Sequence, residues 1–482
     1  MKKTFLTNLA LLLMLNFLVK PFWVLGIDRT VQNVVGAESY GFYFSLFGFS
    51  LLLNIILDAG ITNFNNRNIA QHHQLLGKYL SNIVTFKFIL AIIYFAVSLV
   101  IAFIIGYTPD QIRLLLVLIF NQFVASFVLY LRSNLSGLHL FRTDSILSVL
   151  DRFLMILICG ILLWGNITRS AFRIEWFVYA QTAAYLITAL ISFSIVLAKA
   201  SFFKPRFDIR YFIIIFRQSY PFALLSLFMV FYYRVDSVML ERLLPDGKIQ
   251  AGMYAQAYRI LDAAAMVGFL FGGLLLPIFS RMLKRREPVE QLTQISYMLL
   301  IVPTVIVSLA CIFFRSELMD LLYLKHVELS ANILAVLMLG YIAISTSYIF
   351  GTLLTANGNL KAMNIMAGSG VLLNIILNLV LIPKYQALGS AIASLVTQTI
   401  TALIQVVLVY RILRFSVNLG LIVRLTLLSV ALILTGILLQ TVSVVWFYRL
   451  FIFAGTGLLI AFLFRLLNIR ILYRILRNGD TV

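Results

Sequence analysis

The stretch PFALLSLFMVFYYRVDSVML, residues 221–240, is apolar for most of its length but carries Arg234 and Asp236. Twenty residues of α-helix span about 30 Å, which is the thickness of the hydrocarbon core of a bilayer. A charged side chain at the centre of such a helix costs about 2.5–3.5 kcal/mol when it faces lipid. The stretch therefore predicts a transmembrane helix, with Arg234 facing a polar cavity or a partner inside a helix bundle.

Apolar runs of similar length recur along the whole chain. It has 482 residues, of which 62% are hydrophobic and 12% are charged. Soluble domains are usually about 45–50% apolar. The short alternating segments of a membrane β-barrel are absent, so helices are the remaining way to satisfy the backbone in lipid. We predict an all-α, polytopic integral membrane protein with about fourteen transmembrane helices.

The distribution of Lys and Arg predicts the orientation of the chain. With the N-terminus inside, inner segments hold about twice as many of these residues as outer flanks, so both termini are expected to be cytoplasmic. The net charge of +20 then reflects orientation and contact with anionic lipids, and we expect no nucleic acid partner. Cys159 and Cys311 lie in apolar segments, and no disulfide or metal site is expected from them.

Four more cations interrupt apolar segments in the same way as Arg234. They are Lys20, Lys87, Arg152 and Arg259. Together the five predict a positively charged cavity for an anion that crosses the membrane. The guanidinium fork of arginine fits phosphate oxygens bidentately, and lysine supplies a point charge.

Ion pairs are the alternative interpretation of these cations. Arg259 and Asp262 are three residues apart, the spacing of a pair on one helix face, and Arg152 directly follows an aspartate. Lys20 and Lys87 have no acidic neighbour in the sequence. We therefore expect these two lysines to be the better candidates for substrate phosphate.

Three acidic residues inside spans are candidates for H⁺ or Na⁺ coupling: Asp58, Asp236 and Asp262. Asp58 also follows Ser50 and Asn54 at four-residue spacing. That spacing predicts one polar face of a continuous helix.

A basic linker and a repeated Gly-x-Tyr motif predict the domain organisation. The stretch KASFFKPRFDIR, residues 199–210, is the longest polar break in the first half. Gly41 and Tyr43 before it match Gly252 and Tyr254 after it. Transporters built from repeats show such paired features. We predict an N-lobe of six spans with the linker (1–204), a pseudo-symmetric C-lobe of six spans (205–415), and two C-terminal spans with a cytoplasmic tail (416–482).

Three segments carry a family resemblance: VVGAESYGFYFSLFGFSLLLNIILDAGI (34–61), YYRVDSVML with AGMYAQAYRILDAA (232–264), and TANGNLKAMNIMAGSGVLLNIILNLVLIPKYQALGSAIAS (355–394). They resemble bacterial polysaccharide flippases of the Wzx type, in the MATE-like multidrug/oligosaccharidyl-lipid/polysaccharide superfamily. Gln386 departs from the glycine that this family usually has there. The resemblance implies a MATE-like fold with the five cations on spans that line a central cavity.

The resemblance also implies a function. Such a chain would flip an undecaprenyl-pyrophosphate-linked glycan from the inner to the outer leaflet of the bacterial inner membrane by alternating access. Its partners would be this glycan, membrane lipids and polysaccharide polymerase machinery. The sequence holds no G-x-x-x-x-G-K-[ST] phosphate loop for ATP, so we expect no cofactor, and an ion gradient or downstream consumption of the product as the energy source.

Three alternatives stay open. A flippase for the peptidoglycan lipid precursor also needs a basic cavity, because its headgroup is anionic. A multidrug or ion antiporter that exports cationic drugs would need an acidic cavity, whereas the cavity predicted here is cationic. A membrane glycosyltransferase or polymerase would need catalytic acids or histidines at a spacing that the outer connectors do not offer, so we expect no enzymatic activity.

Overall fold

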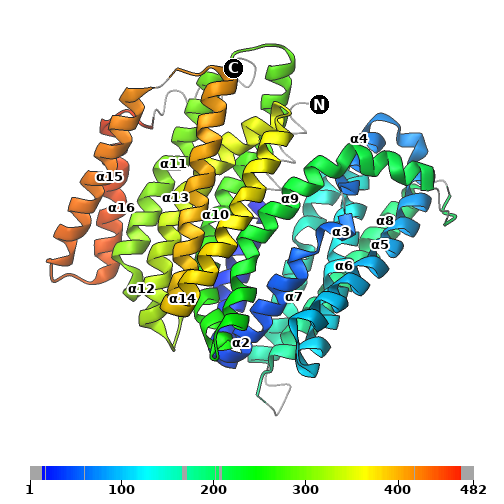
Figure 1. Ribbon diagram of the computed structural model, residues 1–482, viewed down its shortest axis with the longest axis horizontal. Coiled ribbons are helices and arrows are strands. Elements are labelled where there is room, and N and C mark those ends of the chain that lie inside the picture. Colours follow the sequence, from blue (N-terminus) through cyan, green and yellow to red (C-terminus); the bar gives the residue numbers. More distant parts are fainter. Residues whose placement is uncertain are drawn as a thin grey trace. The chain divides into compact units, whose positions relative to one another are not determined.

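The computed structural model describes residues 14–16, 18–58, 60–165, 171–200, 202–205, 209–416 and 418–467. All regular elements in these ranges are helices (Figure 1). Eleven of the helices are long and apolar enough to cross a bilayer. The predicted all-α, polytopic fold is therefore confirmed.

The chain divides into two compact units, Met1–Gly252 and Met253–Val482. The first contains η1 (Trp23–Asp28), α2 (Arg29–Leu52), α3 (Ile55–Asp58), α4 (Ile61–Gln71), η2 (His73–Leu75), α5 (Leu76–Ile105), α6 (Pro109–Gly137), α7 (Phe141–Trp164), α8 (Ile174–Lys199) and α9 (Ile209–Leu243). The second contains most of α10 (Gly247–Lys284), then α11 (Glu290–Phe313), α12 (Arg315–Leu322), α13 (Val327–Ala356), α14 (Leu360–Leu413), α15 (Leu419–Gln440) and α16 (Trp446–Leu463). The two compact units are not the predicted lobes, because the lobes were defined by repeated motifs and not by contacts. The predicted lobe boundaries therefore stay a prediction.

Three predicted spans are not counted separately among the eleven helices, and helix length, composition and the range of the described residues explain the difference. α14 has 54 residues and would be about 80 Å long if straight, so it holds two predicted spans. Gln386, with φ 54° and ψ −135°, marks the break between them. α2 is the second predicted span, and its glycines, serines and Glu38 make it less apolar than the eleven. The first predicted span lies partly outside the described residues.

Large apolar side chains cover the outer faces of these helices. Ile104 is 79% exposed, and Ile92 and Leu463 are each 69% exposed. Soluble proteins rarely expose continuous apolar surface on this scale. These faces are therefore suited to lipid.

Each unit has its own core. In the first, α6 packs against α2, α4, α7 and α8, and Leu80, Tyr130 and Leu135 are fully buried between α4, α5, α6, α7 and α8. In the second, α13 packs against α11 and α14. The α15–α16 pair packs on α11 through a cluster that includes Leu432 and Phe453 (Figure 1). These cores hold the spans that carry the predicted site residues.

Candidate functional site

The chain breaks its helix twice around Asp58. α2 ends at Leu52, and Asn54, Ile56 and Leu57 then donate their backbone N–H groups to carbonyls three residues back. Such tighter turns have about three residues per turn, so the expected polar face of Ser50, Asn54 and Asp58 is not continuous. That expectation is wrong because the helix changes its winding between Leu52 and Ile55. A second break, with φ +83° at Gly60, separates α3 from α4.

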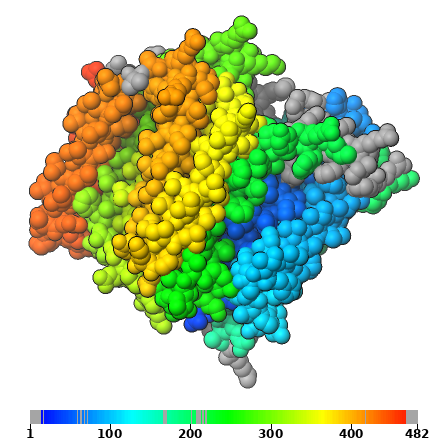
Figure 2. Space-filling model, viewed as in Figure 1, coloured from blue at the N-terminus to red at the C-terminus, as the bar shows by residue number. Residues whose placement is uncertain are grey.

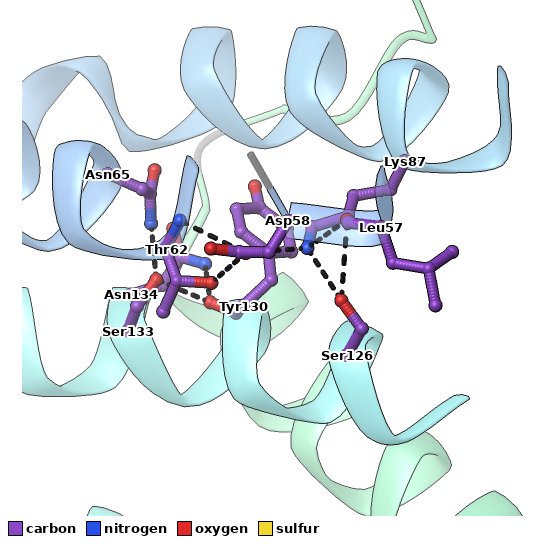
Figure 3. Close-up of polar contacts among 9 residues, drawn as sticks. All are labelled: Leu57, Asp58, Thr62, Asn65, Lys87, Ser126, Tyr130, Ser133 and Asn134. Atoms are coloured by element: carbon purple, nitrogen blue, oxygen red, sulfur yellow. Dashed lines mark hydrogen bonds and ion pairs between the residues drawn. The ribbon is translucent and has the colours of Figure 1, made fainter. Parts of the chain in front are cut away.

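The break gives Lys87 its partners (Figure 3). The Lys87 ammonium donates to the Leu57 carbonyl at 2.8 Å, to Asp58 Oδ1 at 2.9 Å and to Ser126 Oγ at 2.9 Å. A lysine ammonium has three N–H donors, so all three are satisfied by protein acceptors. The carbonyl of Leu57 can accept because α3 stops one residue later. Lys87 therefore joins α3, α5 and α6 at one buried point.

Asp58 has further donors on its own side of the site. The backbone N–H of Thr62 donates to Asp58 Oδ1 at 3.3 Å, and the Thr62 hydroxyl donates to the same oxygen. Lys87 is fully buried. A buried ion pair is favourable only when its remaining donors and acceptors are satisfied. Here all three Lys87 donors are bonded, and the Asp58 side chain remains 29% exposed.

Polar contacts continue from this pair along the α4–α6 packing (Figure 3). The Asn65 amide donates to Ser133 Oγ at 2.8 Å, and the Ser133 hydroxyl donates to the Tyr130 carbonyl at 2.6 Å. The Asn134 amide donates to the same carbonyl at 2.9 Å. Of these contacts, the Asn65–Ser133 hydrogen bond joins α4 to α6 and helps to fix their register beside the Lys87 site.

Two predicted cations lie together elsewhere in the first unit. Lys20 is within electrostatic reach of Arg152, Asp151 and Arg132. The Arg152 guanidinium stands 5.5 Å from the centroid of the Trp23 ring. Lys20 lies three residues before Trp23, the first residue of the π-helical segment η1. Such segments are frequent at functional sites. We call Lys20, Trp23, Asp151, Arg152 and Tyr185 the cation–aromatic cluster.

Aromatic contacts support the cluster from α8. The Arg152 guanidinium is 5.9 Å from the Tyr185 ring centroid, and Arg152 Nε is 3.7 Å from Asp151 Oδ2. Trp23 stacks on Phe177 with their ring centroids 5.7 Å apart. The predicted pairing of Arg152 with its neighbouring aspartate is formed, but it involves one carboxylate in a group that also contains Lys20.

Asp28 is a buried carboxylate that we did not select as a site residue from the sequence. It is 1% exposed and accepts hydrogen bonds from the Tyr40 hydroxyl at 2.9 Å and 3.0 Å, and from the Gln32 amide at 3.2 Å. Residues four apart on a helix are neighbours, so the sequence could have predicted the contact between Asp28 and Gln32.

The remaining predicted residues lie on α9 and α10. Asp236 is buried and Arg234 is half-buried on α9, where α2 approaches closely: a Cβ added at Gly48 would lie 3.3 Å from the Arg234 carbonyl oxygen. In the second unit, Arg259 Nη1 is 3.6 Å from Asp262 Oδ2. The predicted i,i+3 ion pair is therefore formed. Among the described residues, no group of three or more His, Cys, Asp or Glu side chains could hold a metal ion.

Solved structures with this fold are membrane transporters. A structure of the lipid II flippase MurJ in an inward closed conformation matches with a TM-score of 0.71 and 17% identity over 97% of this chain and 99% of that one. An inward-facing multidrug resistance MATE family transporter of the MOP superfamily matches with a TM-score of 0.61 and 15% identity, over 83% and 96%. The Vibrio cholerae MATE transporter VcmN in its bent form gives 0.56 and 14%, over 86% and 97%. The fold is that of MATE-like transporters.

Two family models match the sequence. The model for polysaccharide biosynthesis proteins matches residues 5–283, and the MatE model matches residues 221–380. The chain belongs to the polysaccharide biosynthesis protein family. No curated protein matches the sequence. The resemblance to polysaccharide flippases of the MATE-like superfamily is thus confirmed.

Proposed function

We propose that this chain flips an oligosaccharide linked to a polyprenyl pyrophosphate from the inner to the outer leaflet of the bacterial cytoplasmic membrane. The pyrophosphate and glycan cannot cross hydrocarbon unaided, while the polyprenyl tail can stay in lipid. Transport by alternating access needs no covalent change in the substrate. Membership of a polysaccharide biosynthesis family supports a glycan as cargo, and polymerase machinery as the consumer of the product.

The cation–aromatic cluster is the observation that carries this proposal. Lys20 is within electrostatic reach of Arg152, Asp151 and Arg132. Arg132, which lies next to the cluster, is itself paired with Asp144, whose Oδ1 is 2.8 Å from Arg132 Nε. The group therefore has an excess of positive charge beside apolar spans. A diphosphate would offset that excess, and the guanidinium of Arg152 suits its oxygens.

In this proposal the other predicted cations, Arg234, Arg259 and Lys87, contact the substrate at other points of the transport cycle. Arg234 and Arg259 would contact the phosphates or the first sugars in part of the transport cycle. Lys87 is held by Asp58 in this conformation, so it would reach substrate only after that pair opens. Asp58, Asp236 and Asp262 remain our candidates for coupling to H⁺ or Na⁺.

A second candidate function is transport of the peptidoglycan lipid precursor. The match to a lipid II flippase over nearly the whole of both chains favours it. Both cargoes present a pyrophosphate, so the cation–aromatic cluster suits either one. Only the glycan distinguishes them.

The test is the accumulation of lipid-linked sugars on the inner leaflet of cells that lack this chain. Wild type, Lys20→Ala and Arg152→Gln would be restored at equal expression, with Arg113→Gln as the control because Arg113 is exposed. We expect wild type and the control to clear a lipid-linked oligosaccharide that the two cluster variants leave inside. Accumulation of the peptidoglycan precursor alone would replace the first proposal by the second, and no change in either lipid would refute both.

A further inference from the structure

A cavity of about 750 Å³ lies within the second unit, between α11, α13, the C-terminal part of α14, and α15. Ile301, Val305, Phe350 and Leu425 form apolar parts of its wall. The C-terminal half of α14 and α15 both reach the face shown in Figure 2. All four helices are candidate membrane spans, so the cavity lies at the level of lipid.

The cavity is amphipathic. Thr293 and Gln294 on the first turns of α11, Asn418 before α15, and Tyr410 and Arg411 near the end of α14 line it at one end. Farther along α11 and α15 the lining is mainly apolar, and the hydroxyls of Thr426 and Ser429 there donate to carbonyls of their own helix. A molecule that fits must therefore have a polar head and an apolar tail.

Arg411 supplies the charge at the polar end. It is exposed, and among the described residues it makes no hydrogen bond or ion pair. Glu290, the first residue of α11, forms no ion pair with Arg411: its Oε1 accepts from the Ser416 backbone N–H at 3.0 Å, from the Ser416 hydroxyl at 2.7 Å and from the Gln294 amide at 3.4 Å. The head of the ligand is therefore expected to be anionic.

We propose that this cavity binds an anionic glycerophospholipid of the bilayer, with its phosphate on Arg411 and one acyl chain between α11 and α15. Basic pockets between transmembrane helices on the cytoplasmic side are typical sites for anionic headgroups. In the predicted topology the N-terminus is cytoplasmic and Arg411 follows the twelfth span, so Arg411 is expected on that side. The volume is within the range of about 300–1,000 Å³ for ligand pockets. One cation and few polar groups suit a small headgroup and not a long glycan.

The site has a structural consequence for the C-terminal pair of helices. α15 and α16 pack on α11 through the apolar cluster around Leu432 and Phe453. A lipid in the cavity would fill the space between α15 and the end of α14. Because a ligand that binds only the folded state stabilises it, the lipid would raise the thermal stability of this part of the chain.

The test uses native mass spectrometry on the purified full chain after incubation in nanodiscs of phosphatidylglycerol and phosphatidylcholine in equal amounts. Wild type is compared with Arg411→Gln, with Ser429→Phe, which places a ring in the cavity wall, and with Arg424→Gln. Arg424 is exposed on α15 and does not line the cavity, so it is the matched control. Undecaprenyl phosphate is added as a competitor in a separate series.

We expect wild type and Arg424→Gln to retain one phosphatidylglycerol with about fivefold preference over phosphatidylcholine. Arg411→Gln should lose the preference, and Ser429→Phe should retain neither lipid. Arg411 is exposed, so its variant should fold even if the Ser429 variant does not. Equal retention of both lipids by wild type, or an unchanged preference in Arg411→Gln, would overturn the proposal. Displacement of phosphatidylglycerol by an equal amount of undecaprenyl phosphate would assign the cavity to the carrier lipid instead. None of these readouts depends on transport, so the result is independent of the proposed function.

Discussion

The Lys87 ammonium lies 2.9 Å from Asp58 Oδ1, although the two residues are 29 positions apart and on different helices. A break between α3 and α4 makes this contact, because it frees the Leu57 carbonyl as a second acceptor. The position of Lys87 therefore depends on the irregular backbone around Asp58.

Removing one member of this pair should destabilise the protein more than removing both. Lys87→Met leaves the Asp58 carboxylate without its cation, and such changes cost about 3–5 kcal/mol of unfolding free energy. Lys87→Met with Asp58→Asn should recover a large part of the loss, because no buried charge remains. Thermal unfolding in detergent measures this, with Lys78→Met as the control because Lys78 is exposed on the same helix. Equal stability of the single and double variants would show that an unpaired Asp58 charge is not the cause of the lost stability.

Gly41 should not tolerate even an alanine. A Cβ at Gly41 would overlap the Lys248 carbonyl oxygen and lie 2.5 Å from the Gly252 nitrogen, which are both backbone atoms at the start of α10. Gly41→Ala is expected to lower the unfolding free energy by about 1–3 kcal/mol or more. Gly273→Ala is the control, because its Cβ would meet no heavy atom within 4 Å and alanine favours helix. Equal melting temperatures for the two variants would contradict the close packing of α2 on the start of α10.

Gln386 offers a stabilising substitution. Its φ of 54° and ψ of −135° form a backbone conformation that glycine adopts with least strain. Gln386→Gly should raise the unfolding free energy by about 1 kcal/mol. Lys384→Gly, at an exposed helical position two residues earlier, should lower it by about 1 kcal/mol. A loss of stability in both variants would mean that Gln386 is not strained.

Arg152 should not be replaceable by lysine. Lys keeps the charge but loses the planar guanidinium that packs over Trp23 and Tyr185 and fits phosphate oxygens in pairs. Arg152→Lys is expected to reduce transport of the lipid-linked glycan about tenfold without lowering the melting temperature. Transport at the wild-type rate would show that only the charge at this position is needed.

Hydropathy alone was sufficient to predict the helical class, because span length and backbone satisfaction in lipid leave few alternatives. The Arg259–Asp262 pair was also predictable, since three residues on one helix are neighbours. The partner of Lys87 was not, because it depends on tertiary packing and on a helix break without proline. The approach of Lys20 to Arg152 depends on packing between segments far apart in the sequence, which periodicity does not encode.

The departure from glycine at Gln386 was a sequence signal of an unusual backbone conformation, and the structure gives its dihedral angles. The break there divides α14 into two spans. Hydropathy predicted two spans in this region but could not show how the chain passes from one to the other.

The central claim is that Lys20 and Arg152 together bind the pyrophosphate of a lipid-linked oligosaccharide. The most direct measurement is the rate at which such a lipid crosses the membrane of vesicles that contain the purified chain, followed by exposure of its glycan to an added glycosidase. We predict that the Lys20→Ala, Arg152→Gln double variant is at least about tenfold slower than wild type, while Arg113→Gln is unchanged. Equal rates for wild type and the double variant would contradict the claim.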